Sequence, residues 1–104
     1  MTWYSLGGKR FETWRAVADY AQIVLHRSLL GVALEGEDAA FVRNLFEFHP
    51  EAVKKAGPGI DFFYVGLMPG WGTRNFFVYR SDGTFDNFSI KKCVESMRKQ
   101  LGSH

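Results

Sequence analysis

The sequence has very little of the chemistry that marks a secreted or membrane-spanning protein. It contains one cysteine, Cys93, so no disulfide can form within the chain, and we expect an intracellular, reducing compartment. No apolar run approaches the roughly 20 residues of a membrane span. The start, Met1-Thr2-Trp3-Tyr4, does not resemble a signal peptide, and no targeting segment is visible. We therefore expect no membrane association, with a nuclear, plastid or other organellar location left open.

Signatures of metal binding and catalysis are also missing. The side chains best suited to zinc, Cys93, His26 and His49, match no zinc-ligand spacing. The Gly-rich stretch Gly57-Pro58-Gly59 lacks the Lys-Ser/Thr pair of a phosphate-binding loop. We therefore expect no metal ion, no cofactor and no enzymatic activity.

Four residues that could carry chemistry have structural interpretations that we favour. His49 follows Leu45 by one helical turn, so its ring could cap a helix end or bond a strand carbonyl. Asp82 and Gly83 together suit a tight β-turn. Cys93 lies on an apolar helical stripe, where a cysteine packs as a small, inert hydrophobic residue. We expect structural roles for all four.

What the chain does have is enough apolar and aromatic material for one core. It is 104 residues long, 46% hydrophobic and 16% aromatic, which is ordinary for a globular domain and too apolar for disorder. We expect a single domain over residues 1–104. An extended segment over residues 2–12 turns at Gly7-Gly8, and residues 102–104 form a frayed tail.

Apolar periodicity predicts three helices. The first has an N-cap at Thr13 and is expected to stop at Gly31. The second begins near Glu37 and carries its apolar face on Phe41, Val42, Leu45 and Phe46, and Pro50 either ends it or starts a new turn. The third begins at Ser89. Between the second and third helices, a short turn carries Lys54 and Lys55.

The region between the second and third predicted helices is typical of β-structure. We predict strands over 60–67, 75–80 and 84–88, with a loop over 68–73. Helices and strands that do not alternate favour an α+β fold, with a small antiparallel sheet of about three to four strands packed with about three helices.

The dipeptide Asp82-Gly83 predicts a two-residue type I′ hairpin. In that register Arg80 pairs with Phe85, Tyr79 with Asp86, and Phe77 with Phe88. One sheet face then carries Phe76, Val78, Arg80 and Phe85, and the other carries Phe77, Tyr79, Asp86 and Phe88.

One face of this sheet is a candidate binding surface. Three helices can cover one face, and an aromatic face left partly open would suit the stacking of unpaired bases. The alternative is that helices, the N-terminal segment and Trp71 bury both faces. Basic residues give a second clue, because they gather in the C-terminal half at Lys54-Lys55, Arg80, Lys91-Lys92 and Arg98-Lys99. Such residues make salt-sensitive phosphate contacts or simply form solvated helix faces.

Several stretches together resemble the DCL family of plastid and nuclear RNA-maturation factors. They are Gly36-Glu37-Asp38 with Phe41 and Leu45, His49-Pro50, Lys55 with Gly57 and Gly59-Ile60, the run Phe76 to Thr84, and Asp86, Phe88-Ser89 and Lys92-Cys93. The resemblance covers roughly residues 11–95. It implies RNA-linked work, since the family includes a plastid protein needed for ribosomal RNA maturation, a nucleolar relative and the C-terminus of a plant-specific RNA polymerase largest subunit. It implies no established catalytic reaction.

Our leading hypothesis is a monomeric, non-catalytic RNA-binding or RNA-processing accessory domain. The expected stacking rings are Trp71, Phe77 and Tyr79. A protein-interaction module within a larger RNA-protein or polymerase assembly is the alternative, through the 68–71 loop and any open sheet face. The expected phosphate contacts come from Lys55, Arg74, Arg80, Lys91 and Lys92.

Overall fold

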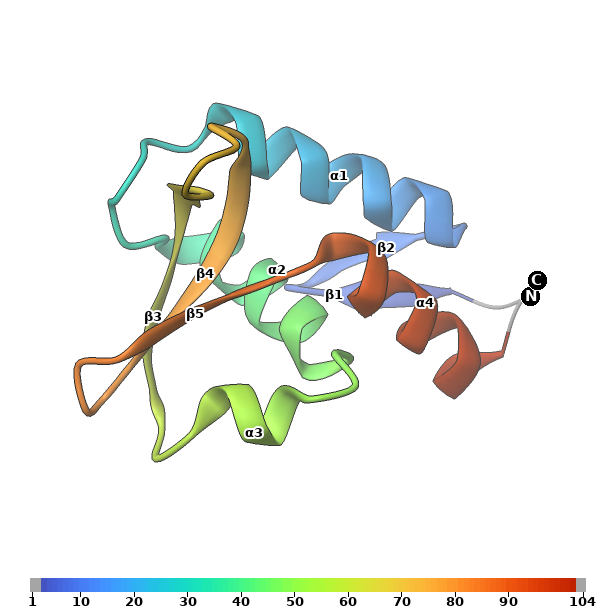
Figure 1. Cartoon of the computed structure of the whole chain (residues 1–104). Coiled ribbons are helices and arrows are strands. Elements are labelled where there is room, and N and C mark those ends of the chain that lie inside the picture. Colours follow the sequence, from blue (N-terminus) through green and yellow to red (C-terminus); the bar gives the residue numbers. More distant parts are fainter. Residues whose placement is uncertain (1–2, 103–104) are drawn as a thin grey trace.

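A computed structural model describes residues 3–102, and within them the chain forms four helices and five strands in two antiparallel sheets. This confirms the α+β class. Residue 2 of the predicted N-terminal segment and residues 103–104 of the predicted tail lie outside the described range. The elements follow one another as β1 (Tyr4–Leu6), β2 (Lys9–Phe11), α1 (Trp14–Arg27), α2 (Gly36–Glu47), α3 (Ala52–Ala56), β3 (Ile60–Leu67), β4 (Arg74–Arg80), β5 (Phe85–Phe88) and α4 (Ile90–Leu101) (Figure 1).

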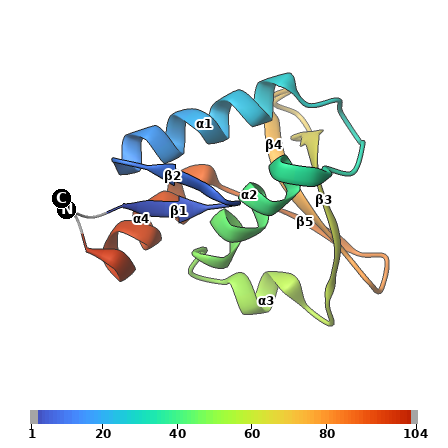
Figure 2. The ribbon, with the colours of Figure 1, turned by 180° about the vertical axis from the view of Figure 1, so that it is seen from behind.

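The predicted N-terminal turn at Gly7-Gly8 is a β-hairpin between β1 and β2. Gly7 has a φ of +59°, which glycine adopts without strain. A Cβ on Gly7 would lie 2.6 Å from the backbone nitrogen of Phe41 in α2, so the bare turn is what lets the hairpin approach that helix. Figure 2 shows the hairpin lying among α1, α2 and α4, away from the larger sheet.

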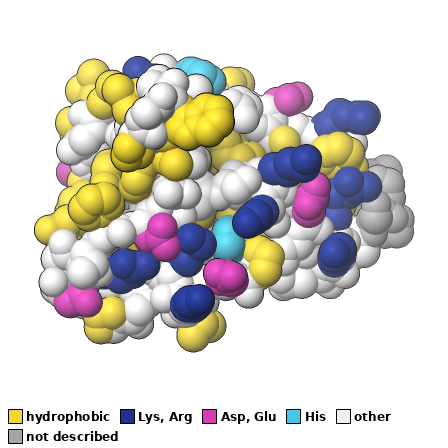
Figure 3. Space-filling view, in the orientation of Figure 1, with side chains coloured by type: hydrophobic (Ala, Val, Ile, Leu, Met, Phe, Trp, Pro, Cys, Tyr) yellow, Lys and Arg dark blue, Asp and Glu magenta, His cyan; other side chains and the backbone are white. Residues whose placement is uncertain are grey.

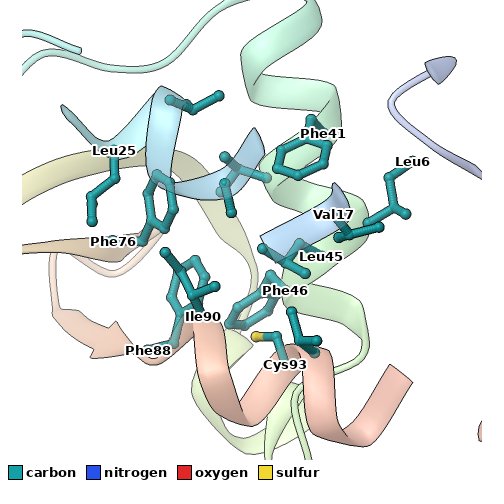
Figure 4. Close-up of a cluster of buried hydrophobic side chains, with 14 of the residues drawn as sticks. Leu6, Val17, Leu25, Phe41, Leu45, Phe46, Phe76, Phe88, Ile90 and Cys93 are labelled. Carbon is teal, nitrogen blue, oxygen red and sulfur yellow. The ribbon is translucent and has the colours of Figure 1, made fainter. Parts of the chain in front are cut away.

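The core lies between the helices and one face of the β3–β4–β5 sheet. The predicted apolar face of α2 is confirmed, since all four of its residues are buried. In Figure 4, Phe88 of the sheet lies between Phe76 of the sheet and Phe46 of α2, and Ile90 and Cys93 of α4 point into the same cluster. The sheet contributes five buried side chains to this interior: Phe63, Val65, Phe76, Val78 and Phe88.

Helix α1 ends earlier than predicted. It stops at Arg27 rather than running to Gly31, because Ser28 adopts an extended conformation and its hydroxyl donates to the carbonyl of Val24. The chain then runs beside β3, where Gly31 donates its N–H to the carbonyl of Val65. Pairing with a distant strand therefore ends the helix, and local sequence does not report it.

A fourth helix forms where we predicted a turn. Lys54 and Lys55 lie in the short helix α3, which ends at Gly57 with a φ of +57°. Gly57 and Gly59 then carry the chain around the expected corner into β3, which has the predicted bounds 60–67. The role of α3 is to bring Lys55 under the sheet, where it contacts β4 and β5.

The predicted register of the β4–β5 hairpin is wrong by one residue. Tyr79 pairs with Phe85, and Phe76 pairs with Phe88. The N–H of Arg80 donates to Thr84 O, and the N–H of Gly83 donates to Arg80 O, so the loop has three residues with only Gly83 at positive φ. A type I′ turn needs two such residues. Because side chains alternate along a strand, the slip moves every β5 side chain to the opposite face.

Candidate functional site

The corrected register gathers five aromatic side chains on the sheet face that no helix covers. Strand pairing places Phe62 beside Tyr79 and Tyr64 beside Phe77, and it places Phe85 beside Tyr79 from the other neighbouring strand. These positions alternate with the core-facing ones, so they point away from the helices. Phe77, at the centre of the face, is covered by its neighbouring rings and is only 7% exposed; Phe62, Tyr64 and Tyr79 are half-buried. We call this surface, made of Phe62, Tyr64, Phe77, Tyr79 and Phe85, the open aromatic face.

The rings of the open aromatic face pack against one another in two stacked pairs. Phe62 and Tyr79 have centroids 4.9 Å apart with planes at 15°, and Tyr64 and Phe77 are 5.2 Å apart at 16°. Near-parallel rings at these distances are offset-stacked, so the neighbouring ring already covers part of each ring's surface. Phe85 is different: it contacts Phe77 at 6.3 Å with a 56° tilt and is 60% exposed. Phe85 therefore offers the freest ring surface.

Burial also acts on the ionisation of one ring of this surface. It raises the pKa of Tyr64 above its ordinary value, and Tyr79 raises it further. The glycine at position 66 lies against the same rings, because a Cβ there would lie 2.9 Å from the Phe77 ring and 3.3 Å from the Tyr64 ring. The rings thus lean over bare backbone at one end of the face.

Backbone groups at both edges of the sheet are bonded within the fold, which favours the face as the place for contact. Beside β3, Gly31 and Leu34 donate N–H groups to Val65 O and Phe63 O. On β5, the N–H of Asn87 donates to the side chain of Asp86, and the carbonyl of Asn87 accepts from Lys55 Nζ at 2.9 Å. Edge strands covered in this way are poor templates for an added strand.

Two predicted phosphate-binding residues, Lys55 and Arg80, lie in a polar cluster on the helix side of the sheet. Lys55 Nζ contacts Asp86 Oδ2 at 2.9 Å, and Arg80 Nε donates to Lys55 O at 2.7 Å. Burial opposes ionisation of Asp86, but the hydrogen bond and charge of Lys55 hold its pKa below the ordinary value. The two cations are thus bonded within the fold and join α3 to the hairpin.

Arg74, a third predicted phosphate contact, closes the end of α1. Its Nη1 donates to Leu25 O at 3.1 Å and to Ser28 O at 2.8 Å. The last carbonyls of a helix lack partners in the helix, and a guanidinium supplies them. Arg74 therefore holds β4 against α1.

Lys91 and Lys92 differ from these three cations because both are exposed in the first turn of α4. Trp71, the first predicted stacking ring, is 81% exposed at the tip of the β3–β4 loop. Gly70 and Gly72 on either side of it have φ values of +79° and +68°. Figure 3 shows hydrophobic side chains gathered over the sheet at the left, and Lys and Arg side chains to the right and below.

The four residues expected to be structural have the following places. His49 is buried, and its Nδ1 accepts the N–H of Glu51 at 3.0 Å; burial, then the charges of Lys55 and Lys92, lower its pKa. Gly83 takes the positive φ of the hairpin loop. Among residues 3–102 no cluster of three or more His, Cys, Asp or Glu side chains could hold a metal.

Asp82 and Cys93 complete this set. Asp82 Oδ1 accepts from the N–H of Thr84 at 3.0 Å and from its hydroxyl at 2.6 Å, and these bonds lower its pKa. Burial raises the pKa of Cys93 to about 12, so the thiol stays protonated at neutral pH. A thiol in that state is a poor nucleophile.

Sequence reasoning missed part of the open aromatic face. It placed Phe77 and Tyr79 together, but it put Phe85 on the opposite side and did not single out Phe62 or Tyr64. The alternation of β3 carried a usable signal, since Phe62, Tyr64 and Gly66 share a parity. The missing information was the register that joins that parity to β4.

The structure thus defines an α+β domain with helices on one sheet face and a ring-bearing surface on the other. Its sequence matches the model of a family described as "Protein of unknown function (DUF3223)" over residues 22–94. The chain belongs to this family. The family's description assigns no reaction.

Curated relatives confirm the resemblance to the DCL family. The chain is 37% identical to Protein EMBRYO DEFECTIVE 514 of Arabidopsis thaliana over 93 residues, covering 88% of this chain and 46% of that protein. It is 28% identical to Protein DCL, chloroplastic, of Solanum lycopersicum, covering 91% and 44%. It is 33% identical to DNA-directed RNA polymerase IV subunit 1 of Arabidopsis thaliana, covering 79% and 6%. The chain thus spans less than half the length of these relatives.

A solved structure shares the fold over nearly its full length. The solution NMR structure of an uncharacterized protein from Rhodospirillum rubrum is 30% identical, with a TM-score of 0.77, and the match covers 97% of this chain and 94% of that one. Within residues 3–102, every helix is too short or too polar to cross a bilayer.

Proposed function

We propose that this chain is a non-catalytic RNA-binding module that holds unpaired bases on its open aromatic face. The observation that carries the proposal is a sheet face, on the side away from the helices, with five aromatic side chains, of which Phe85 is exposed, three are half-buried and Phe77 is buried by the others. Base–aromatic stacking needs only a ring surface and tolerates any base. Sheets that present aromatic side chains in this way are a common platform for single-stranded RNA.

Exposed cations near the sheet support the proposal. Lys91 and Lys92 lie in the first turn of α4, shortly after β5, and neither forms an ion pair with another residue of the described range 3–102. Phosphate contacts from such side chains position a strand without reading its sequence. The relatives add RNA-related context, because one is named as a subunit of an RNA polymerase. Lys55, Arg74 and Arg80 contribute positive potential and a rigid scaffold in this proposal.

The residues of types that enzymes often use in catalysis have structural contacts in this fold, which fits a function without catalysis. His49 is buried with its Nδ1 bonded to backbone, and the thiol of Cys93 is buried and protonated. Asp82 is bonded to Thr84 in a turn. These residues stabilise the fold, and the RNA surface lies elsewhere.

The proposal is tested by fluorescence polarisation with a labelled single-stranded RNA of about 12 nucleotides at two salt concentrations. We expect Phe85→Ala to weaken binding about 10-fold, because a stacked base contributes about 1–3 kcal/mol. Val53→Ala is the matched control, since Val53 is an apolar side chain 90% exposed on α3. The proposal fails if the wild-type chain shows no salt-dependent binding at high micromolar concentration.

A second candidate function, docking to a protein, has one observation in its favour. Exposed aliphatic side chains follow one another in the segment beside β3, where Leu29 is 73% exposed and Val32 is 51% exposed. Neighbouring apolar side chains on a surface are typical of protein contacts. A partner whose capture resists RNase and is lost in Leu29→Ala would favour this function through that segment, and loss in Trp71→Ala would favour it through the β3–β4 loop.

A further inference from the structure

A groove opens where α1, the β3–β4 loop and the start of α4 meet. Its volume is about 630 Å³, which is ample for a short stretch of a sugar-phosphate backbone. The side chains that matter for the argument come from α1, the β3–β4 loop, the start of β4 and the start of α4: His26, Thr73, Arg74, Asn75, Ser89 and Lys91. We call this hollow the α1–α4 groove.

The charge of the α1–α4 groove sets it apart from the neighbouring hollow on the other side of α4. None of the described residues that line the groove is acidic, while Arg74 and Lys91 both contribute to its wall. The other hollow also has lysines, Lys92 and Lys99, but Glu95 lies between them in sequence and Glu51 faces them. A carboxylate repels a phosphate, so of these two hollows the groove, with no acidic side chain in its described lining, is the better site for an anion.

Arg74 brings its charge to the groove in a fixed position. Its hydrogen bonds to Leu25 O and Ser28 O hold the guanidinium between β4 and α1. An ordered cation loses little side-chain entropy when a phosphate approaches. The hydrogen bonds that fix Arg74 within the fold therefore also make its guanidinium a preorganised part of the groove.

The groove adjoins the open aromatic face and the Trp71 loop. Asn75 belongs to the same strand parity as Phe77 and also lines the groove. Its amide is held by the loop, through a 3.6 Å contact of Nδ2 with the sulfur of Met68. Thr73 follows Trp71 by two positions in that loop, and β5 leads directly into Ser89. A single RNA strand whose bases lie on the rings would thus reach the groove without crossing another helix or strand of the protein.

We infer that the α1–α4 groove binds phosphodiester groups of the single-stranded RNA whose bases lie on the open aromatic face. This inference rests on the proposed function and adds a location for the backbone. It separates two lysines that sequence treats alike: each borders a hollow that contains Glu95, but Lys91 also lines the α1–α4 groove and Lys92 does not.

The test compares Lys91→Ala with Lys92→Ala. Both variants lose one positive charge from adjacent exposed positions in one helical turn, so any general electrostatic effect is shared. We expect Lys91→Ala to weaken binding of a labelled oligouridine about 5-fold and to reduce the salt-dependence slope by about 0.7, the value for one phosphate contact on a single strand. Lys92→Ala should change affinity less than about 2-fold.

An abasic oligoribonucleotide of the same length distinguishes this inference from the proposed function. Lys91→Ala should weaken its binding by the same factor, because the phosphates remain, whereas Phe85→Ala should have no effect without bases to stack. Equal losses in both lysine variants, or none in either, would overturn the groove while leaving the ring contacts standing. A Phe85→Ala effect that is as large on abasic as on intact RNA would instead overturn base stacking. No binding of either probe by the wild-type chain would overturn both.

Discussion

The two faces of the β3–β4–β5 sheet have similar side chains but different neighbours. On the helix side, Phe63, Phe76 and Phe88 are sealed by α1, α2 and α4. On the other side, rings of the same kind pack against one another, in the two stacked pairs and in the contact between Phe77 and Phe85. The difference teaches that aromatic content alone does not identify a core. The face that the helices pack against becomes the core, and the other face does not.

The comparison predicts its largest contrast in stability. Phe76→Ala should lower the free energy of unfolding by about 3–5 kcal/mol, since Phe76 is 0% exposed and its loss leaves a cavity. Phe85→Ala should lower it by less than about 1 kcal/mol, as for a surface side chain. Urea unfolding followed by circular dichroism measures both. Similar losses in the two variants would mean that another part of the chain covers the open aromatic face.

Most of the helix side was predictable from sequence because its signals are local. The apolar stripe of α2, the caps Thr13 and Ser89, and the bounds of β3 each follow from neighbours a few positions apart. The end of α1 was not predictable, because Gly31 bonds to Val65 across the fold. Local periodicity finds elements, whereas their contacts determine some of their ends.

The open aromatic face was predictable only in part, for a reason that lies in one loop. Asp82-Gly83 fits a two-residue turn, yet the chain uses a three-residue loop with Gly83 at positive φ and Asp82 bonded to Thr84. The observed register buries Phe88 at the start of α4 and puts Asp86 beside Lys55. Both advantages depend on distant partners, which a turn motif does not contain.

Gly83→Ala tests whether this loop keeps the two faces apart. Gly83 has a φ of +86°, and an L-residue in the left-handed region costs about 1–2 kcal/mol. We therefore expect a loss of unfolding free energy of about that size, measured by urea titration. Gly70→Ala, in the other hairpin loop of the sheet, is the matched control for glycine strain, with a φ of +79°.

Amide chemical shifts should distinguish these two variants, because only the loop at Gly83 sets the register of β5. In Gly83→Ala, amide chemical shifts should change along β5, from Phe85 to Phe88, whereas in Gly70→Ala they should change in the loop around Trp71. Shift changes confined to the mutated turn in both variants would show that the hairpin loop does not determine which side chains face the helices.

The smallest expected effect is a pH response that belongs to the helix side alone. His49 is buried, and burial lowers its pKa from the ordinary value of 6.5. The unfolded chain therefore binds a proton more readily, so stability conferred by neutral His49 is complete above about pH 6.5 and is lost as pH falls through the folded-state pKa. The rings of the open aromatic face are Phe and Tyr, which do not titrate in that range. The midpoint temperature of thermal unfolding should fall between about pH 7 and 5, and His49→Gln should flatten that fall, while the affinity of the folded chain for RNA keeps the pH dependence of the wild type.

An equal fall in His49→Gln would assign the acid response to other groups. The cluster of Asp86, Lys55 and Arg80 is then the next place to look, because protonation of Asp86 removes its attraction to Lys55.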